Sequence, residues 1–385
     1  MIIIKLKKDK EKKVKNLYPW IFKDETLEIS GDKNDGELCN VFSSDYEFIG
    51  KGIYSNSNIA CKMLTFYDEE INEIFFEKKI EKARKKRLGI NSKFFRYIHA
   101  EADGLPGLII DKYDDIYVLQ IRNIGMEKFK SFIINILIKL ENPKSIYERS
   151  DFETGISEDI SRNVGIVYGK EIESDIIIEE HGIKYFVDIK KGQKTGFFFD
   201  QRDSRFFVRS LINKGDHVLD AHTYTGAFAF NMAYAGAEKV IALDKDKDSI
   251  EMAEKNKNFN NFENIDFFNT TFEEYSSNYK GKKFDLIVLD PPSMIKKKQE
   301  RKKGVELFKS LVEKSSYLLK EDGIMGLCSC AYQADIDLLI ESTRKAYFNQ
   351  KKEIQVIGIT YQSCDHPWVI QIPESLYLKC LWFKI

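Results

Sequence analysis

From about residue 176 onward, short apolar runs alternate with helical periods, and this pattern most constrains the fold of the 385-residue chain. Such alternation is typical of βαβ units that build a parallel sheet. The four clearest apolar runs, each followed by a helical segment, are residues 218–219, 240–243, 286–289 and 324–327. Residues 354–360 and 376–383 look like strands with no helix between them, which predicts a closing antiparallel hairpin. We therefore expect an open α/β sheet.

The front of the chain differs in pattern. Residues 1–70 read as short β elements separated by turn clusters rich in Ser, Gly, Asp and Asn. Residues 71–175 mix strands at 116–121 and 146–149 with helices at 78–88 and 126–140. Because chains of this length usually hold two or three domains, the sequence predicts a β-rich domain over 1–70, a middle α+β domain over 71–175 and the α/β domain over 176–385.

Composition excludes several classes of protein. The hydrophobic share of 43% and the charged share of 31% exclude wholesale disorder, and a net charge of −1 argues against a binder whose whole surface is basic. No apolar run approaches the roughly 20 residues that span a bilayer, and no signal-peptide pattern is present. Six cysteines without a Cys-x-x-Cys pair predict reduced thiols, no metal site and a cytoplasmic protein.

Ligands of an open α/β sheet bind outside the carboxyl ends of its strands. Asp220 ends the first strand, and the loop after it holds a single glycine, Gly226, in place of the glycine fingerprint that cradles a pyrophosphate. An acid at this position can accept from an ammonium group. Asp244 ends the next strand, where an acid takes the hydroxyls of a ribose. Together these residues predict S-adenosylmethionine, although an ordinary strand–helix turn and a solvated turn are the alternatives.

Two further strand ends carry reactive groups. Asp290 begins an Asp-Pro-Pro-Ser sequence, whose prolines fix an extended backbone that can hold the acid against a planar base. Cys328 and Cys330 flank Ser329 at the end of the next apolar run. A thiol facing the cofactor can act as a nucleophile, whereas a buried cysteine is more often inert filler. If the strand continues through them, alternation points both thiols to one face, so spacing does not separate them.

With these motifs the chain resembles a class I methyltransferase, and more closely the bacterial ribosomal RNA large-subunit methyltransferases of the RlmI-like type, which make 5-methylcytosine in 23S RNA. The resemblance runs almost end to end, and the Asp-Pro-Pro motif within it is shared by many methyltransferases. The other stretches that carry it are Tyr18-Pro19-Trp20-Ile21-Phe22, Gly52-Ile53-Tyr54-Ser55, His99-Ala100-Glu101-Ala102-Asp103-Gly104-Leu105-Pro106-Gly107-Leu108, Gly192-Gln193-Lys194-Thr195-Gly196-Phe197-Phe198-Phe199-Asp200-Gln201-Arg202, Tyr224-Thr225-Gly226, Asp365-His366-Pro367 and Pro373-Glu374-Ser375-Leu376-Tyr377-Leu378-Lys379.

This resemblance implies a Rossmann-like, mostly parallel sheet with an antiparallel hairpin at its C-terminal end. It also implies an N-terminal β-barrel PUA domain that binds RNA and a small β-rich middle domain. The cofactor positions that it carries over are Gln193, Asp220, Tyr224, Gly226, Asp244 and Thr271. At three places the chain departs from the family pattern: Thr271 replaces an acid, Met294 an aromatic residue and Ala331 a small polar residue.

The resemblance further implies that Cys330 attacks carbon 6 of a cytosine while Asp290 hydrogen-bonds ring nitrogen 3. Cys328 stays the alternative nucleophile, and the base that removes the carbon 5 proton is not identified. The target base is expected to be single-stranded or flipped out. Family members often form homodimers, but nothing in this sequence marks a self-complementary surface. The competing hypotheses are an RNA base N-methyltransferase, which needs no thiol, and a non-catalytic RNA-binding protein.

Three basic stretches are candidates for gripping RNA. Residues 5–15 hold seven basic and two acidic side chains, residues 78–87 hold seven and one, and residues 296–303 hold six and one. Such runs often only solvate a surface, and that alternative is at least as strong for the first two. The third follows the Asp290 motif, so we expect it to contact RNA.

Overall fold

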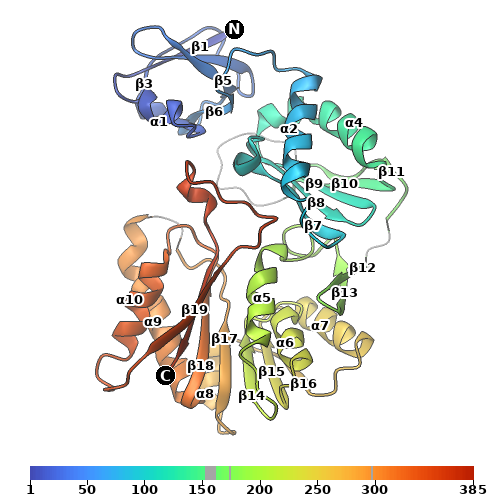
Figure 1. Ribbon diagram of the computed structural model, residues 1–385, viewed down its shortest axis with the longest axis vertical. Coiled ribbons are helices and arrows are strands. Elements are labelled where there is room, and N and C mark those ends of the chain that lie inside the picture. Colours follow the sequence, from blue (N-terminus) through green and yellow to red (C-terminus); the bar gives the residue numbers. More distant parts are fainter. Residues whose placement is uncertain (152–161, 173–174, 296–297) are drawn as a thin grey trace. The chain divides into compact units, whose positions relative to one another are not determined.

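The computed structural model describes residues 1–151, 162–172, 175–295 and 298–385 (Figure 1). The chain forms two compact units. The first unit comprises residues 1–176, 187–199 and 364–375, and the second comprises 177–186, 200–363 and 376–385. No helix among the described residues is long and apolar enough to cross a membrane.

The first unit begins with a six-stranded sheet in the order β2-β6-β5-β4-β1-β3. Its strands are β1 (Ile2–Leu6), β2 (Trp20–Phe22), β3 (Thr26–Ser30), β4 (Leu38–Phe42), β5 (Phe48–Tyr54) and β6 (Ile59–Thr65). One short helix, α1 (Glu11–Lys15), accompanies them. Alternating apolar residues such as Ile2, Ile4 and Leu6 point into one core. The predicted β-rich front domain is thus confirmed.

A second sheet of the same unit has five strands in the order β11-β10-β9-β8-β7. They are β7 (Phe94–His99), β8 (Leu108–Tyr113), β9 (Ile116–Ile121), β10 (Ser145–Arg149) and β11 (Val164–Gly169). Helix α2 (Glu73–Lys86) confirms the helix predicted over 78–88. The single helix predicted over 126–140 is instead two, α3 (Ile124–Lys128) and α4 (Lys130–Glu141). The helical backbone is interrupted at Phe129, where φ is −98° and ψ is 4°.

The two strands β12 (Asp175–Glu180) and β13 (Ile183–Asp188) form a separate hairpin. The second unit is built on a seven-stranded sheet in the order β16-β15-β14-β17-β18-β20-β19. Its strands are β14 (His217–Ala221), β15 (Lys239–Asp244), β16 (Ile265–Asn269), β17 (Phe284–Leu289), β18 (Leu319–Ser329), β19 (Gln355–Tyr361) and β20 (Lys379–Lys384).

Adjacent strands from β16 to β18 pair in parallel, whereas β20 runs antiparallel to both β18 and β19. The antiparallel hairpin predicted at the C-terminal end is therefore confirmed. β16 went unpredicted, because its sequence Ile-Asp-Phe-Phe-Asn lacks the continuous apolar run that marks its neighbours. The fold class predicted for this part of the chain, a mostly parallel Rossmann-like sheet, is also confirmed.

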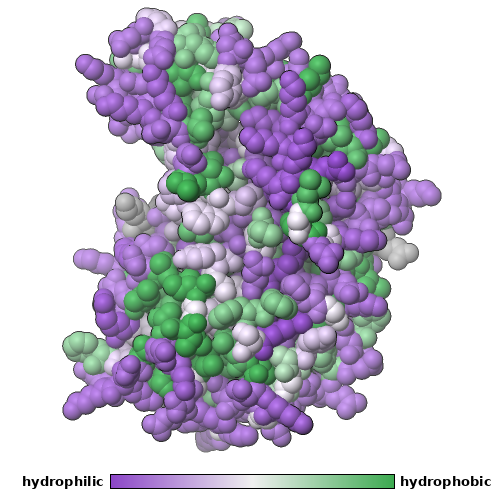
Figure 2. Space-filling model, in the orientation of Figure 1, coloured by the Kyte–Doolittle hydropathy of each residue, from purple (hydrophilic) through white to green (hydrophobic). Residues whose placement is uncertain are grey.

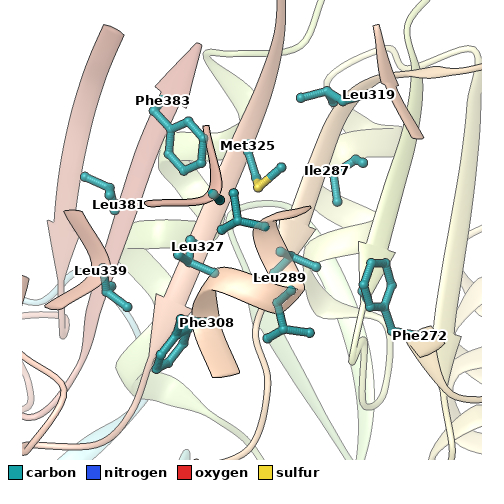
Figure 3. Close-up of a cluster of buried hydrophobic side chains, with 14 of the residues drawn as sticks. Phe272, Ile287, Leu289, Phe308, Leu319, Met325, Leu327, Leu339, Leu381 and Phe383 are labelled. Atoms are coloured by element: carbon teal, nitrogen blue, oxygen red, sulfur yellow. The ribbon is translucent and has the colours of Figure 1, made fainter. Parts of the chain in front are cut away.

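Helices cover both faces of this sheet (Figure 1). They are α5 (Arg202–Arg209), α6 (Ala227–Tyr234) and α7 (Lys247–Phe259) on one face, and α8 (Phe272–Asn278), α9 (Arg301–Leu318) and α10 (Ile336–Ala346) on the other. On the latter face, Ile287, Met325 and Leu327 of the central strands pack against Phe308 of α9 and Leu339 of α10 (Figure 3). This dry core fixes the strands whose ends carry the polar residues discussed below.

The edge strand β19 leaves apolar side chains exposed. Val356 and Ile359 lie on this strand, and Phe348 lies in the segment of chain that connects α10 to β19. Figure 2 shows hydrophobic side chains gathered on this part of the surface. The homodimer expected from the family resemblance stays a prediction, and this edge is where it can be tested.

Candidate active site at the carboxyl edge of the large sheet

The register of the parallel strands brings four predicted site residues to one edge. Asp220 of β14 lies opposite Ala242 of β15 and Val288 of β17. Because these strands run in the same direction, Asp244, Asp290 and Cys330, at or just beyond the ends of β15, β17 and β18, share the edge with Asp220. This is the edge at which open α/β sheets bind ligands.

Asp220 is a fully buried acid with a spare acceptor. Its Oδ2 accepts from the backbone N–H of Ala229 at 2.9 Å and from the Thr223 hydroxyl. Its Oδ1 is buried without a hydrogen-bond partner among the described residues. Burial, aided by the nearby charges of Asp290 and Asp244, raises the pKa of Asp220 to about 7. A buried, orphaned carboxylate oxygen fits a cationic ligand such as an amino group.

The loop between β14 and α6 holds residues in the left-handed backbone region, with φ of 65° at His222, 52° at Tyr224 and 89° at Gly226. A Cβ at position 226 would meet the rings of Phe230 and Phe267 at 2.7 and 2.9 Å. Packing and a positive φ therefore already require glycine here. Its expected role of leaving room for a cofactor chain stays a prediction.

Asp244 is held rigidly in this loop region. Its Oδ2 accepts from the N–H of Tyr224 and its Oδ1 from the N–H of Asp246, both at 2.9 Å. Since a carboxylate offers about four acceptor sites, lone pairs remain for the two hydroxyls of a ribose. The arrangement thus supports the predicted role.

Of the three remaining cofactor candidates, Tyr224 donates its backbone N–H to Asp244, and its assignment stays a prediction. Thr271 and Gln193 are placed differently. The Thr271 hydroxyl accepts from the N–H of Glu274 at 3.2 Å and caps α8, so part of its acceptor capacity is used by the helix. Gln193 is exposed in the first unit, and its carbonyl accepts from the N–H of Gly196 at 2.8 Å. Both assignments stay predictions.

Asp290 has a partner that sequence reasoning missed. The Nε2 of Gln201 donates to Asp290 Oδ2 at 2.9 Å. Gln201 is 4% exposed and belongs to a short 3₁₀ helix, Phe199–Gln201, that directly precedes α5. The preceding residue, Asp200, accepts from the hydroxyl of Tyr377 at 2.7 Å. The resemblance over 192–202 contained the signal, but nothing in its spacing says that position 201 orients the acid.

The two candidate nucleophiles have different surroundings. Cys328 is fully buried and forms a disulfide with Cys380, which lies directly opposite it in the β18–β20 register with a Cα–Cα distance of 4.0 Å. The prediction that all thiols are reduced is therefore wrong for this pair, because non-adjacent strands of the sequence become neighbours in the sheet. β18 ends at Ser329, so strand alternation does not extend to Cys330, which lies just beyond and is partly exposed.

Two stretches that carry the family resemblance meet in a buried network of the first unit. Arg87 Nη2 lies 2.8 Å from Asp103 Oδ2, which also accepts from the N–H of His99 at 2.7 Å. The N–H of Arg96 donates to Asp365 Oδ2, and Arg87 donates to the Asp365 carbonyl, both at 2.9 Å. The network braces the unit internally.

The basic stretches differ in how far their charges are paired. In residues 5–15, Lys12, Lys13 and Lys15 form ion pairs with acidic neighbours. In residues 78–87, Arg84 and Arg87 do the same. In the third stretch, residues 296 and 297 lie outside the described residues, while Lys302 and Lys303 are exposed on α9. RNA contact by the third stretch stays a prediction.

The strand order, the helices on both faces and the polar carboxyl edge define a class I methyltransferase domain. Family models agree: residues 4–66 match a PUA-like domain and residues 212–370 match a methyltransferase domain. The chain is 32% identical to ribosomal RNA large subunit methyltransferase I of Vibrio parahaemolyticus, with 99% of each chain covered. It is 34% identical to the protein of that name from Shewanella frigidimarina, covering 100% of this chain and 99% of the relative.

The chain therefore belongs to the ribosomal RNA large subunit methyltransferase I family. Among solved structures, a Streptococcus mutans chain described provisionally as a SAM-dependent methyltransferase superposes with a TM-score of 0.86 at 21% identity, covering 100% of both chains. Adenosine-bound Trm5 from Methanocaldococcus jannaschii superposes with a TM-score of 0.51 at 18% identity, covering 83% of this chain and 80% of that one. These two similarities show the fold alone.

Family membership confirms the predicted cofactor, S-adenosylmethionine. The residues at the carboxyl edge fit it. The spare buried oxygen of Asp220 suits its amino group, and the fixed carboxylate of Asp244 suits its ribose. When bound, S-adenosylmethionine supplies an electrophilic methyl group.

Proposed function

We propose that this chain methylates carbon 5 of a cytosine in 23S ribosomal RNA, and that Cys330 forms a transient covalent adduct with the base. The relatives are named as ribosomal RNA large subunit methyltransferases, and the front of the chain matches a PUA-like domain. The observation that carries the proposal is the placement of Cys330 and Asp290 just beyond the ends of the adjacent parallel strands β18 and β17.

The chemistry explains why a thiol is needed. Carbon 5 of cytosine is a poor nucleophile until carbon 6 has gained a substituent. In the proposed reaction the Cys330 thiolate forms a bond to carbon 6, and the electrons of the 5,6 double bond make carbon 5 nucleophilic. Carbon 5 then gains the methyl group as the bond between that methyl and the sulfonium sulfur breaks, which leaves S-adenosylhomocysteine. A base removes the carbon 5 proton, the double bond re-forms, and the bond between sulfur and carbon 6 breaks to restore the thiolate.

Asp290 is assigned the stabilisation of the base during this addition. Its Oδ2 already accepts from Gln201, which fixes the rotation of the carboxylate. Because a carboxylate has about four acceptor sites, Asp290 can also accept from ring nitrogen 3 when that nitrogen is protonated, which neutralises negative charge that develops in the ring. Gln201 is thus proposed as the residue that positions Asp290.

Cys330 is preferred over Cys328 as the nucleophile. The sulfur of Cys328 is bonded to Cys380 and is fully buried, whereas Cys330 retains a thiol and is partly exposed. Since a flipped-out or single-stranded base must reach the sulfur, the more accessible residue is favoured.

The test is nucleoside mass spectrometry of 23S RNA from cells lacking the protein, after incubation with the purified enzyme and S-adenosylmethionine. Wild-type enzyme is expected to yield 5-methylcytidine. Cys330→Ala should lower the yield by at least about a thousandfold, because removing a covalent nucleophile removes the reaction path.

Cys364→Ala is the matched control, because Cys364 is an exposed cysteine to which the proposed reaction gives no role. It should retain activity, and all three proteins should bind S-adenosylmethionine in calorimetry. An N-methylated product, or full activity of Cys330→Ala, would refute the cytosine carbon 5 assignment. Absence of S-adenosylmethionine binding by wild-type protein would favour a non-catalytic RNA-binding protein instead.

A further inference from the structure

A buried lysine lies beside the proposed nucleophile. β20 runs antiparallel to β18, so its first residue, Lys379, lies opposite Ser329 at the end of β18. Lys379 is 3% exposed. Its Nζ donates to the carbonyl of Ala331 at 2.7 Å and to the carbonyl of Tyr377 at 2.9 Å. Because Ala331 directly follows Cys330, the ammonium is bound to the residue next to the thiol.

No carboxylate of the described residues forms an ion pair with this ammonium. Burial lowers the pKa of Lys379 to about 8, while the negative charges that oppose this shift belong to Asp335 and Cys330. Asp335 is already shared: it pairs with Arg301 at 2.8 Å and caps α10 through the N–H of Leu338. The two carbonyls solvate the ammonium but do not neutralise it. An anion at Cys330 would do so.

We infer that Lys379 activates Cys330, its ammonium stabilising the thiolate against the thiol. The inference rests on the proposed function, since only a nucleophilic role for Cys330 makes a thiolate useful. The thiol proton passes to solvent, and Lys379 keeps its own proton. Lys379 touches neither the base nor the methyl donor in this account, so it is a positioning residue that acts through Cys330.

The experiment measures the rate at which iodoacetamide alkylates each cysteine of the full-length protein between pH 5 and 10, by peptide mass spectrometry. Iodoacetamide reacts with thiolates, so the midpoint of the rate profile reports thiol ionisation. In wild-type protein the midpoint of Cys330 should lie at least about one pH unit below that of Cys364, the exposed reference thiol in the same sample.

Lys379→Met should raise the Cys330 midpoint by about one unit or more, slowing alkylation at pH 7 roughly tenfold, while Cys364 stays unchanged. Lys379→Arg retains the positive charge and should keep the low midpoint. Lys384→Met is the matched control, because Lys384 lies on the same strand in a half-exposed pair with Asp322. It should behave as wild type.

An unchanged Cys330 midpoint in folded Lys379→Met would overturn the inference, because a lysine that only satisfies carbonyls would leave the thiol unaffected. If that variant does not fold, the midpoints of Cys330 and Cys364 in wild-type protein test the inference instead. A Cys330 midpoint equal to or above that of Cys364 overturns the inference, and a lower one that Lys379→Arg preserves supports it.

Alkylation requires neither RNA nor methyl transfer, so its result is independent of the product assay. A lowered midpoint together with an N-methylated product would keep the electrostatic inference and refute the proposed function. A normal midpoint together with 5-methylcytidine as product would refute the electrostatic inference and keep the proposed function.

Discussion

Two buried aspartates, one in each unit, differ in how their charge is compensated. Asp103 in the first unit lies between Arg87 and Lys86, at 2.8 and 2.9 Å. Burial alone would raise its pKa, but these cations hold the pKa below its usual value. Asp220 in the second unit is equally buried, yet among the described residues only a hydroxyl and a backbone N–H bond to it, and its pKa rises to about 7.

The difference separates structure from function. A paired buried charge such as Asp103 is satisfied within the fold, so it needs no ligand. The second unit also contains a buried acid that is paired within the fold. Glu180 bonds to Arg205 at 2.6 Å and to Arg202 at 3.2 Å. At the carboxyl edge of the sheet, no cation from the described part of the chain pairs with Asp220. We interpret this as the place kept for the cationic end of the cofactor.

The largest expected effect comes from breaking the paired site. Arg87→Met removes the cation that bonds to Asp103, and breaking a buried ion pair costs about 3–5 kcal/mol. Hydrogen exchange of the amides in β7 and β8 should report a local destabilisation of that size. Lys93→Met is the control, because Lys93 and Asp114 form an exposed pair whose loss should change exchange little.

Because the pKa of Asp103 is lowered, its stabilising contribution is present above the ordinary aspartate value and is lost as pH falls through the lowered value. The protection of β7 and β8 in wild-type protein should therefore weaken in acid. Equal protection in wild type and Arg87→Met at neutral pH would show that the pair is not structural.

A smaller effect is expected at Asp290, the acid proposed to stabilise the target base. Gln201→Met removes the hydrogen bond to Asp290, and a bond to a charged group contributes about 1.5–3 kcal/mol. The kcat for methyl transfer should fall roughly ten- to hundredfold, with little change in the KM for S-adenosylmethionine. Gln201→Glu should be worse, because it sets a second carboxylate against Asp290. Equal loss in kcat and cofactor affinity would argue for a merely structural role.

The smallest effect concerns the unpaired acid. If the amino group of the cofactor binds ionised Asp220, affinity should rise with pH through about 7, because the folded apo protein holds a proton there below that pH. Calorimetry should find binding roughly tenfold weaker at pH 6 than at pH 8, with proton release near pH 7.

Asp220→Asn should bind weakly at every pH, without this dependence. Asp244→Asn, the matched control at the same edge, should weaken binding but leave the pH dependence in place. Affinity of wild-type protein that is flat between pH 6 and 8 would contradict the reserved-acid interpretation.

The sequence predicted most of the fold because the spacing of apolar residues and the length of apolar runs identify buried strands directly. β15 and β17 are almost wholly apolar, and shorter apolar runs lie within β14 and β18, so all four strands were predicted, with Asp220 one residue before the end of β14 and Asp290 one residue after the end of β17. It failed where tertiary contacts decide. The break at Phe129 and the neighbouring placement of Cys328 and Cys380 depend on packing that no local period encodes.

The same limit applies to the candidate site. Gln201 and Lys379 lie inside stretches with a strong family resemblance, but their partners are Asp290 and Ala331, far away in sequence. Charge runs have the same limit: in residues 78–87, Lys86 and Arg87 pair with Asp103 within the unit, and a count of charges does not tell which cations are paired.

The most direct test of the account uses RNA in which 5-fluorocytidine replaces cytidine. After Cys330 adds to carbon 6 and carbon 5 is methylated, fluorine replaces the proton that must leave, so the adduct persists. We expect an RNA–protein adduct that requires S-adenosylmethionine, and peptide mass spectrometry should place it on Cys330. An adduct on another cysteine, or undiminished turnover without any adduct, would contradict the central claim.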